Sequence, residues 1–138
     1  MSISSICSYI RPIGLILIVL LALVACQTPV MVDPKNDSTI TAQYQLNTLV
    51  GSVETDMDTA FRASIAALDT LGYFRTGEVH KEDNILILSR KVGDEKVYVN
   101  VFKVSEEQSD IHIRIGIIGS LPESQALLSE IQDILMSL

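Results

Sequence analysis

Few side chains in this 138-residue sequence have the type and spacing to support chemistry. His80 and His112 are its only histidines, and no further His, Asp or Glu supplies the spacing of a metal site. We therefore predict no metal site, and we expect both histidines to lie solvated on the strand faces opposite the core. Asp56 and Asp58 stand two residues apart and could act as a general acid and base. Helix capping and the helix dipole explain these carboxylates without chemistry, so we predict no catalytic residue, no cofactor and no enzymatic activity.

The charge balance of the chain restricts its partners. Ten Lys and Arg stand against seventeen Asp and Glu, which gives a formal net charge of −7. Nucleic-acid binding needs a basic face, so we predict no nucleic-acid partner. The acidic balance also disfavours electrostatic adhesion of the whole domain to anionic lipid.

A cysteine follows an apolar run near the N-terminus. The thirteen residues from Ile13 to Ala25 carry no charge and would form roughly 20 Å of helix, less than the ~30 Å core of a bilayer. This length favours the apolar region of a secretory signal, although Arg11 is the only basic side chain before it. Leu23-Val24-Ala25-Cys26 resembles the lipobox of bacterial lipoproteins. The alternative is a cysteine inside an uncleaved anchor helix.

The lipobox resemblance implies a membrane anchor. It implies cleavage between Ala25 and Cys26, attachment of diacylglycerol to the Cys26 sulfur, and acylation of the new amine. Two or three acyl chains would hold the protein permanently, whereas one chain alone binds only marginally. Gln27, rather than Asp, follows the cysteine, which resembles the pattern sent to the outer membrane in enteric-type bacteria. We therefore expect a bacterial envelope lipoprotein on the periplasmic face of the outer membrane, with covalent lipid on Cys26 and no other bound group.

Three segments follow from this interpretation. Residues 1–25 are predicted to be a lipoprotein signal peptide, residues 26–43 the lipidated cysteine and a flexible linker, and residues 44–138 one folded domain. The linker contains Pro29, Pro34 and several turn-forming residues without a sustained period. A flexible coil of this length averages roughly 20 to 25 Å from end to end, so the domain stays near the membrane.

The folded segment alternates strand and helix patterns. A period of two predicts a strand over 45–53, and Asp56 as N-cap begins an Ala-rich helix that stops at Gly72. Strand-like runs follow over 74–81, 85–91, 96–105 and 110–118, and Ile111, Ile113, Ile115 and Ile117 share one face of the last. The final helix begins at Ser120, where Ser120 and Glu123 have the spacing of a capping box.

These elements predict a two-layer α+β domain with a five-stranded antiparallel sheet in the order β-α-β-β-β-β-α, which resembles the helix-grip arrangement. The lipobox, Glu54 to Phe61, Leu71-Gly72-Tyr73, and Ile111 to Gly116 before a Leu-rich helix resemble the small bacterial lipoproteins grouped as a domain of unknown function. Members commonly have Gly-Asp after the Arg-containing strand, whereas Gly119 here precedes Ser120. At the level of fold, the order also resembles the helix-grip modules of the lipoprotein subunit of the outer-membrane barrel-assembly machinery, and fold does not carry function.

The second face of the sheet is the candidate functional surface. If both helices cover one face, several apolar side chains project from the other, together with a histidine and an arginine: Leu86, Leu88, Tyr98, Phe102, Val104, Ile118, His112 and Arg114. Such a patch marks a partner surface, unless strand register or curvature buries it in the same core or one helix packs on each face of the sheet. Arg114 could bind an anionic group or pair with a carboxylate on a neighbouring strand. We expect a non-enzymatic interaction domain with an envelope protein partner; the alternative is a carrier of an apolar or acyl ligand between sheet and helix.

Overall fold

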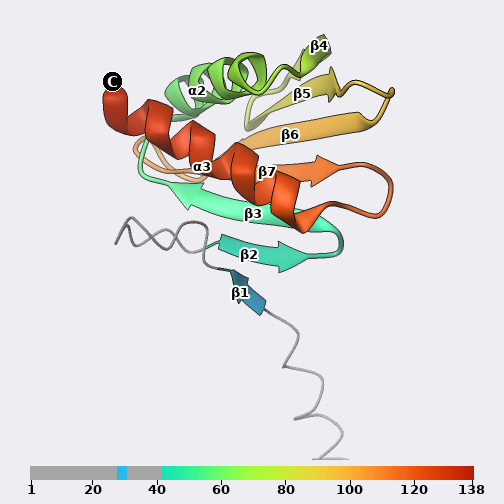
Figure 1. The fold of residues 1–138 in the computed structure, drawn as a ribbon. Coiled ribbons are helices and arrows are strands. Elements are labelled where there is room, and N and C mark those ends of the chain that lie inside the picture. Colours follow the sequence, from blue (N-terminus) through green and yellow to red (C-terminus); the bar gives the residue numbers. More distant parts are fainter. Residues whose placement is uncertain (1–27, 31–41) are drawn as a thin grey trace, which may run out of the picture.

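The computed structural model describes residues 28–30 and 42–138, which form one antiparallel sheet with two helices on one of its faces (Figure 1). The elements in chain order are β1 (Thr28–Val30), β2 (Ala42–Gln45), β3 (Thr48–Val53), α2 (Met57–Thr70), β4 (Phe74–His80), β5 (Asn84–Arg90), β6 (Lys96–Lys103), β7 (Ser109–Ile115) and α3 (Leu121–Ser137). Across the sheet the order is β1-β2-β3-β7-β6-β5-β4. The predicted α+β class and the antiparallel sheet are confirmed.

The predicted count of five strands is wrong. Residues 42–138 contribute six strands, and β1 adds a seventh at the edge of the sheet. The segment 45–53 is not one strand but part of a β2–β3 hairpin, because Leu46 and Asn47 have φ angles of 47° and 64° and turn the chain within two residues. A Leu at such a position carries no turn signal in the sequence. β1 and the first two residues of β2 lie within the segment 26–43, and the rest of that segment lies outside the described residues.

The helix α2 begins as its sequence predicts. The side chain of Asp56 accepts a hydrogen bond of 3.0 Å from the backbone N–H of Thr59, which satisfies one of the free donors of the first turn. At the other end, Gly72 has a φ of +74°, and Tyr73 N–H donates to the Leu68 carbonyl at 2.8 Å. The face toward the sheet consists mainly of small side chains, Ala60, Ala63 and Ala67, all buried. They let α2 pack close to the strands.

The core lies between the helices and one face of the sheet. Its large buried side chains come from alternate positions of four strands and from both helices: Leu49, Leu68, Ile87, Val97, Val99, Val101, Ile111, Ile113, Ile115, Leu127, Leu128 and Ile131. Gly51 on β3 faces α3, and a Cβ added there would lie 2.5 Å from Cδ2 of Leu128. A glycine at this position therefore allows α3 to approach the sheet.

The junction between β7 and α3 differs from the prediction in two details. β7 ends at Ile115, and Gly116 with a φ of +75° turns the chain, so Ile117 is exposed rather than buried with the other isoleucines. Ser120 is the N-cap of α3, but its side chain makes no capping hydrogen bond. Instead of completing a capping box, Glu123 forms an ion pair with Lys91, which joins the start of α3 to the β5–β6 turn.

Candidate functional site

The open face of the sheet, opposite the two helices, brings together six residues that the sequence singles out. Cross-strand register places Leu88, Tyr98 and Arg114 in one row and Leu86, Asn100 and His112 in the next. Phe102 lies in a third row, between Asn84 and Asp110. Residues at these alternate positions point away from the buried set, so the same core does not enclose them. The predicted six are Leu86, Leu88, Tyr98, Phe102, His112 and Arg114, and all belong to the open face.

Two residues predicted for this face lie elsewhere. Val104 and Ile118 fall beyond the ends of β6 and β7, in loops where strand alternation no longer applies. Asn84 and Asn100 also belong to the open face, although they were not among the predicted residues. The side-chain amide of Asn84 donates a hydrogen bond of 2.8 Å to Oδ1 of Asn100. Strand alternation could have predicted both residues, because Asn84 is two residues from Leu86 on β5 and Asn100 is two residues from Tyr98 on β6. The open face is thus amphipathic rather than purely apolar.

On the open face, the guanidinium of Arg114 lies over the ring of Tyr98. The guanidinium carbon of Arg114 lies 5.6 Å from the centroid of the Tyr98 ring, within the range of a cation–π interaction. Arg114 makes no ion pair with any carboxylate in residues 42–138. The cross-strand ion pair considered for it is therefore not formed there. The charge is held over an aromatic ring and remains available to an anionic group.

His112 lies at the centre of the open face and is only partly exposed. Its ring packs against that of Phe102, with centroids 4.6 Å apart. Nearby, the hydroxyl of Ser52 donates to Oδ1 of Asp110 at 2.6 Å. Burial lowers the pKa of His112, and the charge of Asp110 opposes this shift less strongly. His112 is therefore held toward its neutral form.

We expect His112 to make the domain less stable in acid. A histidine whose folded pKa is lowered takes up protons more readily in the unfolded chain, so the stability of its neutral form is complete above its ordinary pKa of 6.5 and declines as pH falls below that value. His112→Gln should flatten the dependence of the free energy of unfolding on pH in this window, as measured by urea denaturation. An unchanged slope in His112→Gln would contradict the assignment.

His80 lies on the other side of the sheet from its predicted place. Its ring contacts that of Phe61 on α2, with centroids 5.3 Å apart, so it faces the helix layer. The cause is a β-bulge between Arg75 and Gly77, where one extra residue shifts the alternation of the rest of β4. Without the bulge, His80 would share the face of His112. A single sequence does not reveal such a bulge.

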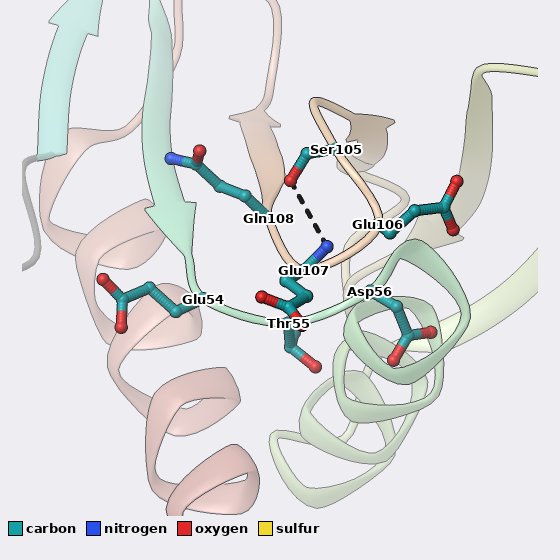
Figure 2. Close-up of a pocket in the computed structure, with 7 residues that line it drawn as sticks. All are labelled: Glu54, Thr55, Asp56, Ser105, Glu106, Glu107 and Gln108. Carbon is teal, nitrogen blue, oxygen red and sulfur yellow. Dashed lines mark hydrogen bonds between the residues drawn. The ribbon is translucent and has the colours of Figure 1, made fainter.

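The carboxylates near the start of α2 line a polar hollow at one end of the sheet (Figure 2). Its volume is about 630 Å³, and its walls come from the β3–α2 and β6–β7 connections. The carboxylates of Glu54 and Glu106 point away from each other in Figure 2. The hydrogen bond from Thr59 lowers the pKa of Asp56, which is occupied as the helix cap. Within the described segments, no three His, Cys, Asp or Glu side chains are grouped to hold a metal ion.

Two further hollows adjoin the open face. One, of about 670 Å³, is lined by the β5–β6 turn together with Lys96, Tyr98, Arg114 and Ile117. The other, of about 200 Å³, lies beside it and shares Lys96 and Tyr98. Neither of them, nor the hollow of Figure 2, lies between the helices and the sheet.

The membrane-related predictions concern the N-terminal segment. Ala25 and Cys26 lie outside the described residues. Among residues 28–30 and 42–138, no helix combines the length and apolar character needed to cross a bilayer. No curated protein matches the chain. Residues 10–134, which include the whole N-terminal apolar run and nearly all of the folded domain, match the family described as Protein of unknown function (DUF3568), and the protein therefore belongs to this family.

Proposed function

We propose that the protein is a bacterial envelope lipoprotein, anchored through acyl chains on Cys26 to the periplasmic face of the outer membrane. The proposal rests on the sequence Leu23 to Cys26 directly after an uncharged apolar run, and on Gln27 after the cysteine. The mature chain would carry its membrane affinity in covalent lipid, since each buried acyl CH₂ contributes about 0.8 kcal/mol.

We further propose that the folded domain is a non-enzymatic interaction module. The observation that supports this role is the open face, on which Leu88, Tyr98 and Phe102 lie uncovered by either helix. Beside them lies Arg114, which forms no ion pair within residues 42–138. Partner surfaces commonly combine an apolar and aromatic centre with a few oriented polar groups. An envelope protein that presents apolar side chains and a carboxylate toward Arg114 would complement it.

The carrier alternative predicts a cavity lined by Ile and Leu between sheet and helices. The three hollows described above are lined mainly by loop and polar residues and open at the surface. Gly51 and Leu128 show how closely α3 packs on β3. No observation among the described residues favours the carrier role, so we do not propose it.

The interaction role is tested by photo-crosslinking of the full chain in cells. A photoreactive amino acid replaces Tyr98 on the open face or, as the control, the exposed Asp133 on α3. We expect discrete adducts of constant mass from position 98 and none of the same mass from position 133, because only the open face contacts the partner.

The specificity of the adduct is checked from a third position. With the photoreactive group at Asn100, the combined changes Tyr98→Ser and Phe102→Ser should reduce the adduct at least tenfold while circular dichroism retains the folded spectrum. The absence of adducts from folded protein at both open-face positions would contradict the proposed role, as would equal adducts from Asp133.

A further inference from the structure

The two ends of the sheet have different surface chemistry. Strand register places four connections at one end, called here the apolar end: residues 46–47, 71–73, 91–95 and 116–120. The opposite end, called the acidic end, is formed by the connections 54–56, 81–83 and 104–108. In Figure 1 the β2–β3 and β7–α3 connections of the apolar end lie to the right, and the end of β3 lies to the left.

Exposed apolar side chains gather at the apolar end. Leu46, Val92, Ile117 and Ile118 are 80–96% exposed, and Leu71 and Phe74 are also exposed there. The connections of the acidic end expose one large apolar residue, Val104, and the C-terminal Met136 and Leu138 lie nearby. Fully exposed Leu and Ile side chains at loop tips contribute nothing to the core, so they add little to the free energy of unfolding of the isolated domain.

The apolar loop tips form one surface. A Cβ added to Gly119 would fall well inside contact distance of the Asn47 carbonyl, and 2.5 Å from the Tyr44 hydroxyl, so the β7–α3 connection touches the β2–β3 turn. A Cβ added to Gly116 would lie 2.5 Å from the Glu95 carboxylate, which places the β5–β6 turn on the other side. Val92 and Ile117 line the same hollow. Three connections distant in sequence therefore present their apolar side chains side by side.

Carboxylate side chains, in contrast, gather at the acidic end of the sheet. The connections of the acidic end hold six carboxylates, those of Glu54, Asp56, Glu82, Asp83, Glu106 and Glu107, against one lysine. Those of the apolar end hold Asp94 and Glu95 against Lys91. Beside the apolar tips, Lys96 and Arg114 line the hollow with Val92 and Ile117, and neither forms an ion pair within the described residues. The carboxylates of the described connections thus lie mainly at the end away from these tips.

The direction of β1 connects the apolar end with the proposed lipid anchor. Thr28 pairs with Tyr44 and Val30 with Ala42. Because β2 runs toward the apolar end, the antiparallel β1 begins at that end. Cys26 precedes Thr28 by two residues, which span at most about 7 Å. The anchor therefore joins the domain at the apolar end rather than through a linker of 20 Å or more.

From these observations we infer that the apolar end docks directly on the lipid bilayer, with Leu46, Val92, Ile117 and Ile118 in the interfacial layer. This inference rests on the proposed lipidation of Cys26. Lys96 then lies at the level of the lipid phosphates, where a cation with apolar neighbours is favoured, and Arg114 stays on the open face. The strands stand away from the membrane, and the eight-residue β6 holds the acidic end roughly 26 Å from it. The open face remains accessible from the side for a partner.

The orientation is tested with fluorescent probes on the acylated full chain. Ile117→Cys and, as the matched control, Val104→Cys each place one thiol on an exposed apolar loop residue, at opposite ends of the sheet. The proteins are labelled with a polarity-sensitive fluorophore in vesicles of phosphatidylethanolamine and phosphatidylglycerol. We expect nitroxide-labelled acyl chains to quench the probe at position 117 at least fivefold more than the probe at 104, and aqueous iodide to show the reverse preference.

The other outcomes each overturn the inference. Equal lipid quenching at both positions would mean that the domain has no fixed orientation, and stronger quenching at 104 would mean that the acidic end faces the bilayer. If the probe at position 117 were shielded from aqueous iodide in cells but not in vesicles, a protein partner instead of lipid would cover the apolar end. Palmitate incorporation is measured on the same samples. Absence of palmitate incorporation would contradict the proposed anchor on Cys26. Equal lipid quenching at positions 117 and 104 of acylated protein would contradict only the docking of the apolar end on the bilayer.

Discussion

Replacing Cys26 with Ser is expected to abolish incorporation of radiolabelled palmitate completely. A serine has no thiol from which the thioether to diacylglycerol can form, and acylation of the amine requires cleavage before residue 26. Without acyl chains, cleaved protein should be released from membranes, since two or more chains supply the affinity. Uncleaved protein keeps its apolar run, so the palmitate label decides the outcome and membrane fractionation supports it.

The chain provides a matched control for this experiment. Cys7 lies before the apolar run, within the segment that cleavage would remove. Cys7→Ser should therefore retain full palmitate incorporation and full membrane association. Continued labelling of Cys26→Ser, or loss of labelling in Cys7→Ser, would refute the assignment of Cys26 as the lipidated residue.

A chain truncated before Ser120 is expected to aggregate. The truncation removes α3, whose Leu127, Leu128 and Ile131 have no solvent exposure. Burial of each such side chain contributes about 1.5–3 kcal/mol, so the three together are comparable with the whole stability of a small domain. The same truncation uncovers the isoleucines of β7 on the core face of the sheet. The measurement is the soluble fraction after expression, together with near-UV circular dichroism.

A shorter truncation controls for loss of the C-terminus itself. Removing residues 136–138 deletes two exposed apolar side chains, Met136 and Leu138, and leaves the buried residues of α3 in place. This protein should stay soluble and unfold cooperatively. If the chain that lacks all of α3 were also soluble and cooperative, α3 could not be the element that closes the core.

Local sequence signals predicted much of the fold. Asp56 caps α2, and Gly72 follows its end as expected, because capping depends on hydrogen bonds within one turn of the chain. The strands β4 to β7 begin within one residue of their predicted positions, because alternation of apolar and polar residues is itself a local property. The same alternation predicted which residues lie on the open face, given that both helices cover the other face of the sheet.

Where the predictions were wrong, contacts between distant segments decided the structure. The β2–β3 turn carries no turn signal at Leu46, and β1 is a strand of three residues that pairs with β2 at the edge of the sheet. The bulge in β4 moves His80 to the helix side. Glu123 pairs with Lys91 on another element rather than with its own helix cap.

The sequence by itself determined the order of the elements from α2 to α3, the caps of α2, and the lipobox resemblance on which the proposed anchor depends, because periodicity, capping and a short motif are all properties of neighbouring residues. Only the tertiary structure decided which surfaces these elements share. Antiparallel register gathers Leu46, Val92 and Ile117, from three separate connections, at the end where β1 begins, and it sends most loop carboxylates to the other. Pairing across the sheet is non-local, so no single segment of the sequence contains that polarity.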